Sequence, residues 1–235
     1  MRISEVMKKS DVGKPWAAYR DRRRSLREER QYILVVSEDK KSSVFYFKAL
    51  NKLLQAHSAT IGLLPKGAGR NTQSLIKFVE KNKLKWLKEV RADIDINDFD
   101  EVWVVFDRDS FPKDKFDNAI DSAKKHGYKV AWSNECFELW YLLHFRDVVA
   151  GISRNAIYDT LTKEMKLSKK YVEFKGDEGI EIHQKMTQNP SVKQAIKRAK
   201  TLFKEFCVEK IPPHRGNPCT LVFMLIEKLL KQLEK

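Results

Sequence analysis

The sequence predicts an α/β protein in which helices cover a parallel sheet. Between residues 32 and 145, apolar runs of strand length alternate with segments whose apolar residues recur at helical spacing. This alternation is typical of βαβ units. The strand candidates are apolar at consecutive positions, which indicates strands buried on both faces. After residue 151 only helical patterns follow, so we expect a helical C-terminal region packed on the sheet.

Two strands are expected in the first part of the sheet. Residues 32–36 (Tyr-Ile-Leu-Val-Val) form the first, and a helix with a regular apolar face follows it. A second strand at 59–64 ends in the glycine-containing turn 65–69. Asn71 or Thr72 is then placed to cap the next helix.

Two further strands complete the expected sheet. The third covers 102–106, and a short helix marked by apolar residues between 116 and 123 follows it, with Gly127 at its end. The fourth strand covers 128–132, and residues 136–145 form an apolar helix.

The C-terminal region is expected to hold three helices, at roughly 155–167, 190–209 and 219–234. Asn217 and Pro218 are typical of a helix start, with Asn as the cap and Pro at the first helical position. The chain is therefore divided into a basic N-terminal arm (1–31), a sheet-containing domain (32–150) and a helical C-terminal region (151–235).

Composition excludes several classes of protein. The chain has 235 residues, of which 42% are hydrophobic and 33% charged, which is typical of a globular protein with a real core. No apolar run reaches the length of a membrane span, and the N-terminus has no apolar stretch of the signal-peptide kind. The three cysteines are widely spaced and match no metal-ligand pattern, so we interpret them as reduced thiols of a cytoplasmic protein.

The charge is uneven along the chain. The formal net charge is +14, and both flanks are basic: residues 1–31 hold 10 Lys/Arg against 5 Asp/Glu, and residues 151–235 hold 17 against 10. The middle part is nearly balanced, with 19 against 17. Carboxylates in a balanced centre and a cationic surround suit an enzyme that acts on nucleic acid.

Acidic residues follow three of the four expected strands. Glu38 follows the first, Asp107 and Asp109 follow the third, and Glu135 and Glu138 follow the fourth. Parallel strands end at the same edge of a sheet, so these side chains should gather in one crevice. Such crowding is costly unless a cation offsets it, and oxygen ligands favour Mg²⁺ or Mn²⁺.

Two acidic residues have a structural interpretation beside the functional one. We interpret Asp39 as a cap of the first helix. Glu138 lies in an apolar helix, where a buried carboxylate needs compensation. It is expected to face the metal with Asp107 and Asp109, or else to pair with a cation such as Arg108 or Lys175.

Several segments resemble the RloB-like family. They are Val35–Glu38 with Ser42 and Tyr46-Phe47, then Val104–Asp109, Trp132–Asn134, Cys136–Phe145 and Asn217–Thr220. The resemblance implies a Toprim-type catalytic domain, the fold of topoisomerases, bacterial primases and OLD-type nucleases. The chain has Asp39 and Ser43 where the family usually has Gly and often a second Glu, which leaves the number of metals open.

The resemblance implies a Mg²⁺- or Mn²⁺-dependent nuclease that cleaves DNA or RNA, including tRNA, in bacterial anti-phage defence. Asp107 and Asp109 are the expected metal ligands, with Glu38 and Glu138 beside them. The resemblance assigns general acid or base catalysis to Glu38. The alternative is a non-catalytic subunit that binds nucleic acid or regulates an ATPase of an abortive-infection system. An ATPase partner and a homo-oligomer are both expected options.

Five basic residues are expected to contact nucleic acid. Arg22, Arg23 and Arg24 lie in the basic arm, where they can meet phosphates. Arg70 follows the Gly67-Ala68-Gly69 turn and precedes a helix, although the turn lacks the ending of a nucleotide-binding loop. Lys175 is the expected contribution from the helical C-terminal region.

Overall fold

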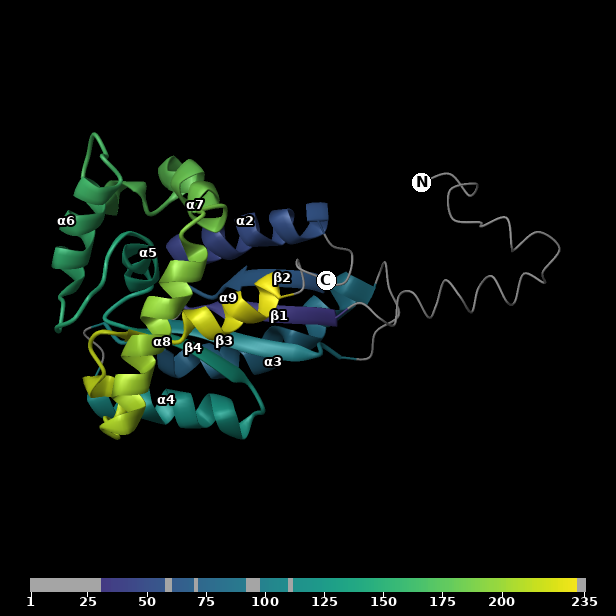
Figure 1. The fold of residues 1–235 in the computed structure, drawn as a ribbon. Helices are drawn as coiled ribbons and strands as arrows, with labels where there is room; N and C mark the ends of the chain where they lie inside the picture. The colour runs from purple at the N-terminus through teal and green to yellow at the C-terminus, as the bar shows by residue number, and fades with distance from the viewer. Residues whose placement is uncertain (1–30, 58–60, 70–71, 92–97, 110–111, 232–235) are drawn as a thin grey trace.

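The computed structural model describes residues 31–57, 61–69, 72–91, 98–109 and 112–231. These residues form an α/β fold with a five-stranded sheet between two layers of helices (Figure 1). The strand order is β2-β1-β3-β4-β5. The strands are β1 (Gln31–Ser37), β2 (Ile61–Gly67), β3 (Glu101–Asp107), β4 (Lys129–Asn134) and β5 (Cys219–Thr220). This confirms the α/β class and all four expected strands.

The first four strands are parallel, and their apolar sequences explain their central position. In β1, residues Ile33 to Val36 are completely buried, because helices cover both faces of the sheet. The chain runs from β1 outward to β2 and then returns across β1 to β3. The strand order therefore reverses between β1 and β3, at the position where α/β proteins usually bind ligands.

Eight α-helices flank the sheet in the described part of the chain. They are α2 (Ser42–His57), α3 (Thr72–Arg91), α4 (Lys113–Lys125), α5 (Glu138–Phe145), α6 (Arg154–Glu164), α7 (Ile180–Thr187), α8 (Val192–Val208) and α9 (Val222–Leu230). One apolar cluster joins α3 and α4 to one face of the sheet, and a second joins α2, α5, α8 and α9 to the other. The second cluster contains Val35 of β1 together with Leu225 and Ile226 of α9, so the C-terminal helices complete the core over the sheet.

The C-terminal region differs from the prediction in two places: α7 (Ile180–Thr187) was not expected, and the segment before α9 is not a helix start. Cys219 and Thr220 form β5, which pairs antiparallel with the end of β4, and α9 begins only at Val222. The prediction that Asn217 caps the last helix was wrong. The Asn217 side chain instead exchanges hydrogen bonds with the backbone of Ile152, at 3.0 and 3.1 Å. A contact 65 residues away along the chain thus replaces the local one.

The described helices give no candidate membrane span, because each is too short or too polar to cross a bilayer.

Candidate active site

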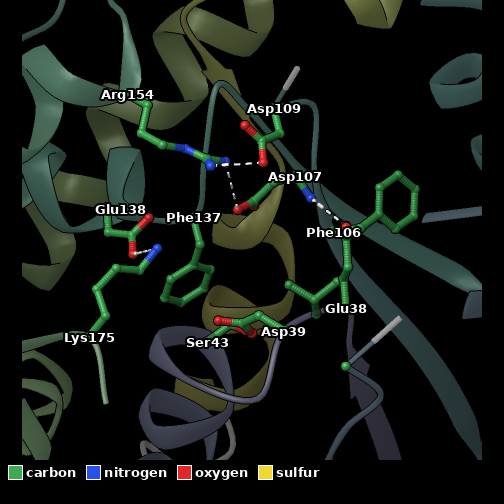
Figure 2. A pocket seen from close by; sticks show the side chains of 12 residues that line it. Glu38, Asp39, Ser43, Phe106, Asp107, Asp109, Phe137, Glu138, Arg154 and Lys175 are labelled. Carbon is green, nitrogen blue, oxygen red and sulfur yellow. Dashed lines mark hydrogen bonds and ion pairs between the residues drawn. The ribbon is translucent and has the colours of Figure 1, made fainter. Parts of the chain in front are cut away.

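A pocket of about 420 Å³ lies where β1 and β3 end, at the reversal of strand order (Figure 2). Segments between residues 38 and 175, far apart along the chain, supply its walls. Twelve residues line it: Glu38, Asp39, Ser43, Gly69, Val105, Phe106, Asp107, Asp109, Phe137, Glu138, Arg154 and Lys175. Of the five acidic residues predicted to converge, four (Glu38, Asp107, Asp109 and Glu138) lie in this pocket, and Glu135 does not.

Backbone pairing of β1 and β3 places Glu38 beside Asp107. The N–H of Glu38 donates to the carbonyl of Val105 at 2.8 Å, which extends the pairing by one residue beyond β1. The N–H of Asp107 in turn donates to Oε2 of Glu38 at 3.3 Å. The ends of β1 and β3 thus place Glu38 and Asp107 next to each other.

A bend after β3 brings Asp109 to the same side as Asp107. In an extended strand, residues two apart point to the same side. β3 ends at Asp107, so the conformation of the following loop decides where the Asp109 side chain lies. The N–H of Asp109 donates to the carbonyl of Glu135 at 3.0 Å, and its φ of 44° lies in the left-handed region that Asp tolerates. Glu135 itself does not line the pocket, and its carboxylate accepts a hydrogen bond from Asn217.

Carboxylates crowd around Asp107. Burial raises the pKa of Asp107 well above its ordinary value, and the nearby charges of Glu138, Asp39 and Glu38 raise the pKa further. The guanidinium of Arg154 acts in the opposite direction. An added cation would relieve this repulsion.

Glu138 is buried and already has a cationic partner. Its side chain is 1% exposed, and Oε1 lies 3.0 Å from Nζ of Lys175 and accepts a hydrogen bond from the Ser42 hydroxyl at 2.8 Å. Burial raises the pKa of Glu138, but Lys175 and Ser42 outweigh it and hold the pKa below its ordinary value. Oε2 has no hydrogen-bond partner among the described residues. The expected pairing with Lys175 is therefore present, and one oxygen still remains available to a ligand.

Two charged residues of the pocket were not predicted as part of the site. Arg154, the first residue of α6, lies 2.8 Å from Oδ2 of Asp109 and 4.0 Å from Oδ2 of Asp107 (Figure 2). No local pattern distinguishes it from the other basic residues of the C-terminal region. Asp39, interpreted as a helix cap, accepts a hydrogen bond from the Ser43 hydroxyl at the start of α2 and also faces the pocket. Burial raises its pKa.

The donor set fits a hard divalent cation. The pocket contains five carboxylates and no Cys or His, which suits Mg²⁺ or Mn²⁺ rather than Zn²⁺. The unpartnered Oε2 of Glu138 and the raised pKa of Asp107 both indicate negative charge that the described residues leave partly uncompensated. Within the described ranges, no three His, Cys, Asp or Glu side chains are already gathered closely enough to form a ready-made metal site.

The predicted nucleic-acid contacts are placed only in part. Lys175 lines the pocket, where Nζ also donates to the hydroxyl of Tyr158 at 2.8 Å. Arg22, Arg23, Arg24 and Arg70 lie outside the described residues.

Comparisons with known proteins give one match. Searches among curated proteins and among solved structures found nothing similar to the chain. The family model described as RloB-like protein matches residues 33–229, a range that begins within β1, ends within α9 and includes every pocket residue. The chain therefore belongs to the RloB-like protein family.

Proposed function

We propose that this protein is a Mg²⁺- or Mn²⁺-dependent nuclease of the Toprim type. The observation that carries the proposal is the convergence of five carboxylates from the ends of β1 and β3 and from α5 at the reversal of strand order. Hydrolysis of a phosphodiester requires a held cation, an activated water and positive charge near the phosphate, and the pocket has residues for each requirement.

Asp107 and Asp109 would hold the ion, with Glu38 or Glu138 completing the ligands. When bound, the ion would polarise the scissile phosphate and lower the pKa of a water molecule. Glu38 would act as the general acid or base, in the role that its position after the first strand has in Toprim-type domains. The negative charge of Asp39 lies near enough to raise the pKa of Asp107. Asp39 would therefore help to neutralise the positive charge of the ion.

Arg154 and Lys175 would bind phosphate oxygens. Both are partly exposed, at 29% and 21%, and both now pair with carboxylates of the pocket. Metal binding by those carboxylates would free the two cationic side chains for the substrate. Arg154 can present two N–H groups to one phosphate, which a lysine cannot.

Nucleic acid is the proposed substrate because the chain carries a net charge of +14 with basic flanks. Either DNA or RNA, including tRNA, would be cleaved. We place the activity in the cytoplasm and in anti-phage defence, with an ATPase as the proposed partner protein, in line with the Toprim-type, defence-linked character that the resemblance implied.

One observation favours the non-catalytic alternative. The pairs Arg154–Asp109 and Lys175–Glu138 already neutralise part of the negative charge without metal. A subunit that only binds nucleic acid, or regulates an ATPase, could keep such pairs permanently.

A substrate panel distinguishes the two functions. The full-length protein is incubated with plasmid, single-stranded DNA and total RNA in Mg²⁺, in Mn²⁺ and with excess EDTA. We expect cleavage of at least one substrate with metal and none with EDTA. Salt-sensitive binding without cleavage under any of these conditions would support the non-catalytic alternative and overturn the nuclease proposal.

A further inference from the structure

A second cavity, of about 680 Å³, lies along the edge of β4, away from the carboxylate pocket. We call it the edge slot. Helix α4 bounds it on one face of the sheet, and α8 and α9 bound it on the other (Figure 1). It is lined by Trp103, Ile120, Lys124, Tyr128, Lys129, Val130, Trp132, Phe203, Phe206, Cys207, Pro213, Leu221, Met224 and Lys228. The slot therefore continues the plane of the sheet between two layers of helices.

The floor of the slot is an incompletely paired strand. β5 pairs only with Ser133 and Asn134 at the end of β4, and no described strand lies beside Lys129 to Ala131. The carbonyl of Ser133 faces β3, where it accepts from the N–H of Arg108, and the carbonyl of Trp132 faces the other side, where it accepts from the N–H of Leu221.

Alternation along β4 then fixes the direction of Val130. Because it lies two residues before Trp132, its N–H and C=O also face away from β3, toward the slot. No backbone hydrogen bond joins Val130 to a described residue on that side. Val130 is itself only 8% exposed. An extended chain that enters the slot would therefore displace the side chains over its backbone and supply the missing partners.

The side walls of the slot are apolar but are poor platforms for nucleobases. Trp103, Tyr128 and Trp132 are each at most 6% exposed, so their ring faces are already covered. Phe206 packs edge-on against Trp132 and stacks with Phe203. Single-stranded nucleic acid needs exposed aromatic faces, whereas a peptide strand needs unpaired backbone groups and apolar recesses.

Every charged residue lining the slot is a lysine. Lys129 and Lys228 both pair with the same oxygen of Glu101, so one positive charge is left in excess there. Lys124 is exposed and forms no ion pair with a described residue. Charge complementarity therefore selects an occupant with carboxylates.

We propose that the edge slot binds an extended, acidic and apolar segment of another protein, which adds to β4 as a further strand. Backbone hydrogen bonds to Val130 would align the segment, apolar side chains would enter between α4 and α8, and Asp or Glu would meet the lysines. The protein's own N-terminal arm is basic, with 10 Lys/Arg against 5 Asp/Glu, and a second copy would bring the same lysines. Neither fits the charge of the slot.

A random peptide library displayed on phage, selected on the full-length protein, tests the proposal. We expect enriched peptides that alternate apolar residues with Asp or Glu. A synthetic copy of the best peptide should lose about tenfold in affinity on Val130→Pro, which removes the outward N–H but no bond to β3. Lys124→Glu should also weaken it, and Lys163→Glu, a matched reversal at an exposed position of α6 outside the slot, should not.

Several results would overturn the proposal. A library that enriches no peptide, enriches basic peptides, or yields peptides that bind Val130→Pro as tightly as wild type would do so. A dimer in sedimentation that Val130→Pro dissociates would assign the slot to a second copy instead. Melting curves of the variants confirm that each is folded, and the nuclease assay is not needed for any of these outcomes.

Discussion

Glu138 illustrates how one buried residue can satisfy a structural and a chemical requirement together. Its carboxylate is 1% exposed in a helix of mostly apolar residues. One oxygen contacts Lys175 and Ser42, and the other has no hydrogen-bond partner among the described residues. The sequence indicated only that such a carboxylate needs compensation. Lys175 is 37 residues away in an irregular segment, so its selection over Arg108 required the tertiary structure.

Removing the Glu138 charge should destabilise the protein. Glu138→Gln leaves Lys175 without its anion in a mostly buried position, and we expect a decrease of about 2–4 kcal/mol in the free energy of unfolding. Glu227→Gln is the matched control, because Glu227 pairs with Lys200 at 2.6 Å on the surface and should cost less than about 1 kcal/mol. Urea unfolding measures both. Equal decreases in the two variants would contradict the role assigned to burial.

Removing the Asp107 charge should instead stabilise the metal-free protein. Burial and the neighbouring carboxylates raise its pKa in the folded state, so the folded protein binds this proton more tightly than the unfolded chain does. The charged form therefore costs stability at neutral pH, and this cost vanishes as pH falls below the ordinary value of 3.8. With EDTA present, Asp107→Asn should melt above wild type at neutral pH, and the difference should shrink on acidification. A variant that melts lower at neutral pH would show that Asp107 is stabilising.

Among the secondary-structure elements, those with a repeating pattern were predictable. The four long strands have continuous apolar runs, and the sequence located each of them. The two-residue β5 has no period to detect, and Asn217-Pro218 before it has the composition of a helix start. Arg154 likewise reaches the pocket from α6 through an ion pair with Asp109. No local pattern in the sequence predicts this pairing.

The end of β2 packs closely against the loop after β1, which carries the pocket residues Glu38 and Asp39. A Cβ on Gly67 would lie 2.8 Å from the carbonyl oxygen of Asp39 and 3.0 Å from Val44 Cγ2, so the loop must shift to admit it. Gly67→Ala should therefore destabilise the protein by about 1–3 kcal/mol. At Gly176 an added Cβ would meet nothing within 4 Å, so Gly176→Ala is the control and should be close to neutral. Similar urea midpoints for both variants would show that the approach of loop and strand is not tight.

At the scale of the whole molecule, the carboxylates of the pocket and the excess of positive charge lie in different parts of the sequence. The carboxylates lie in the central part, whose charge is balanced, and the excess of positive charge lies in the flanks. The pocket nevertheless takes Arg154 and Lys175 from beyond residue 151, so the C-terminal region contributes to the site as well as to the core.

The basic arm should contribute binding rather than catalysis. Replacing Arg22, Arg23 and Arg24 by Ala should reduce the slope of log affinity against log salt by about 0.9 for each phosphate of duplex DNA that the arm no longer neutralises. The cleavage rate at saturating substrate should stay near that of wild type. Fluorescence anisotropy over a salt series measures the slope, and a slope equal to that of wild type would show that phosphates are bound elsewhere on the protein.

The most direct test of the whole account is the cleavage rate of Asp107→Asn in Mg²⁺ or Mn²⁺, compared with wild type and with Asp159→Asn. Asp159 is an exposed carboxylate of α6 outside the pocket. Asp159→Asn therefore makes the same change in charge as Asp107→Asn but leaves the pocket unaltered. We predict that Asp159→Asn cleaves like wild type, and that Asp107→Asn stays folded but cleaves at least about a hundredfold more slowly. Cleavage by folded Asp107→Asn at the wild-type rate would contradict the assignment of this pocket as the active site.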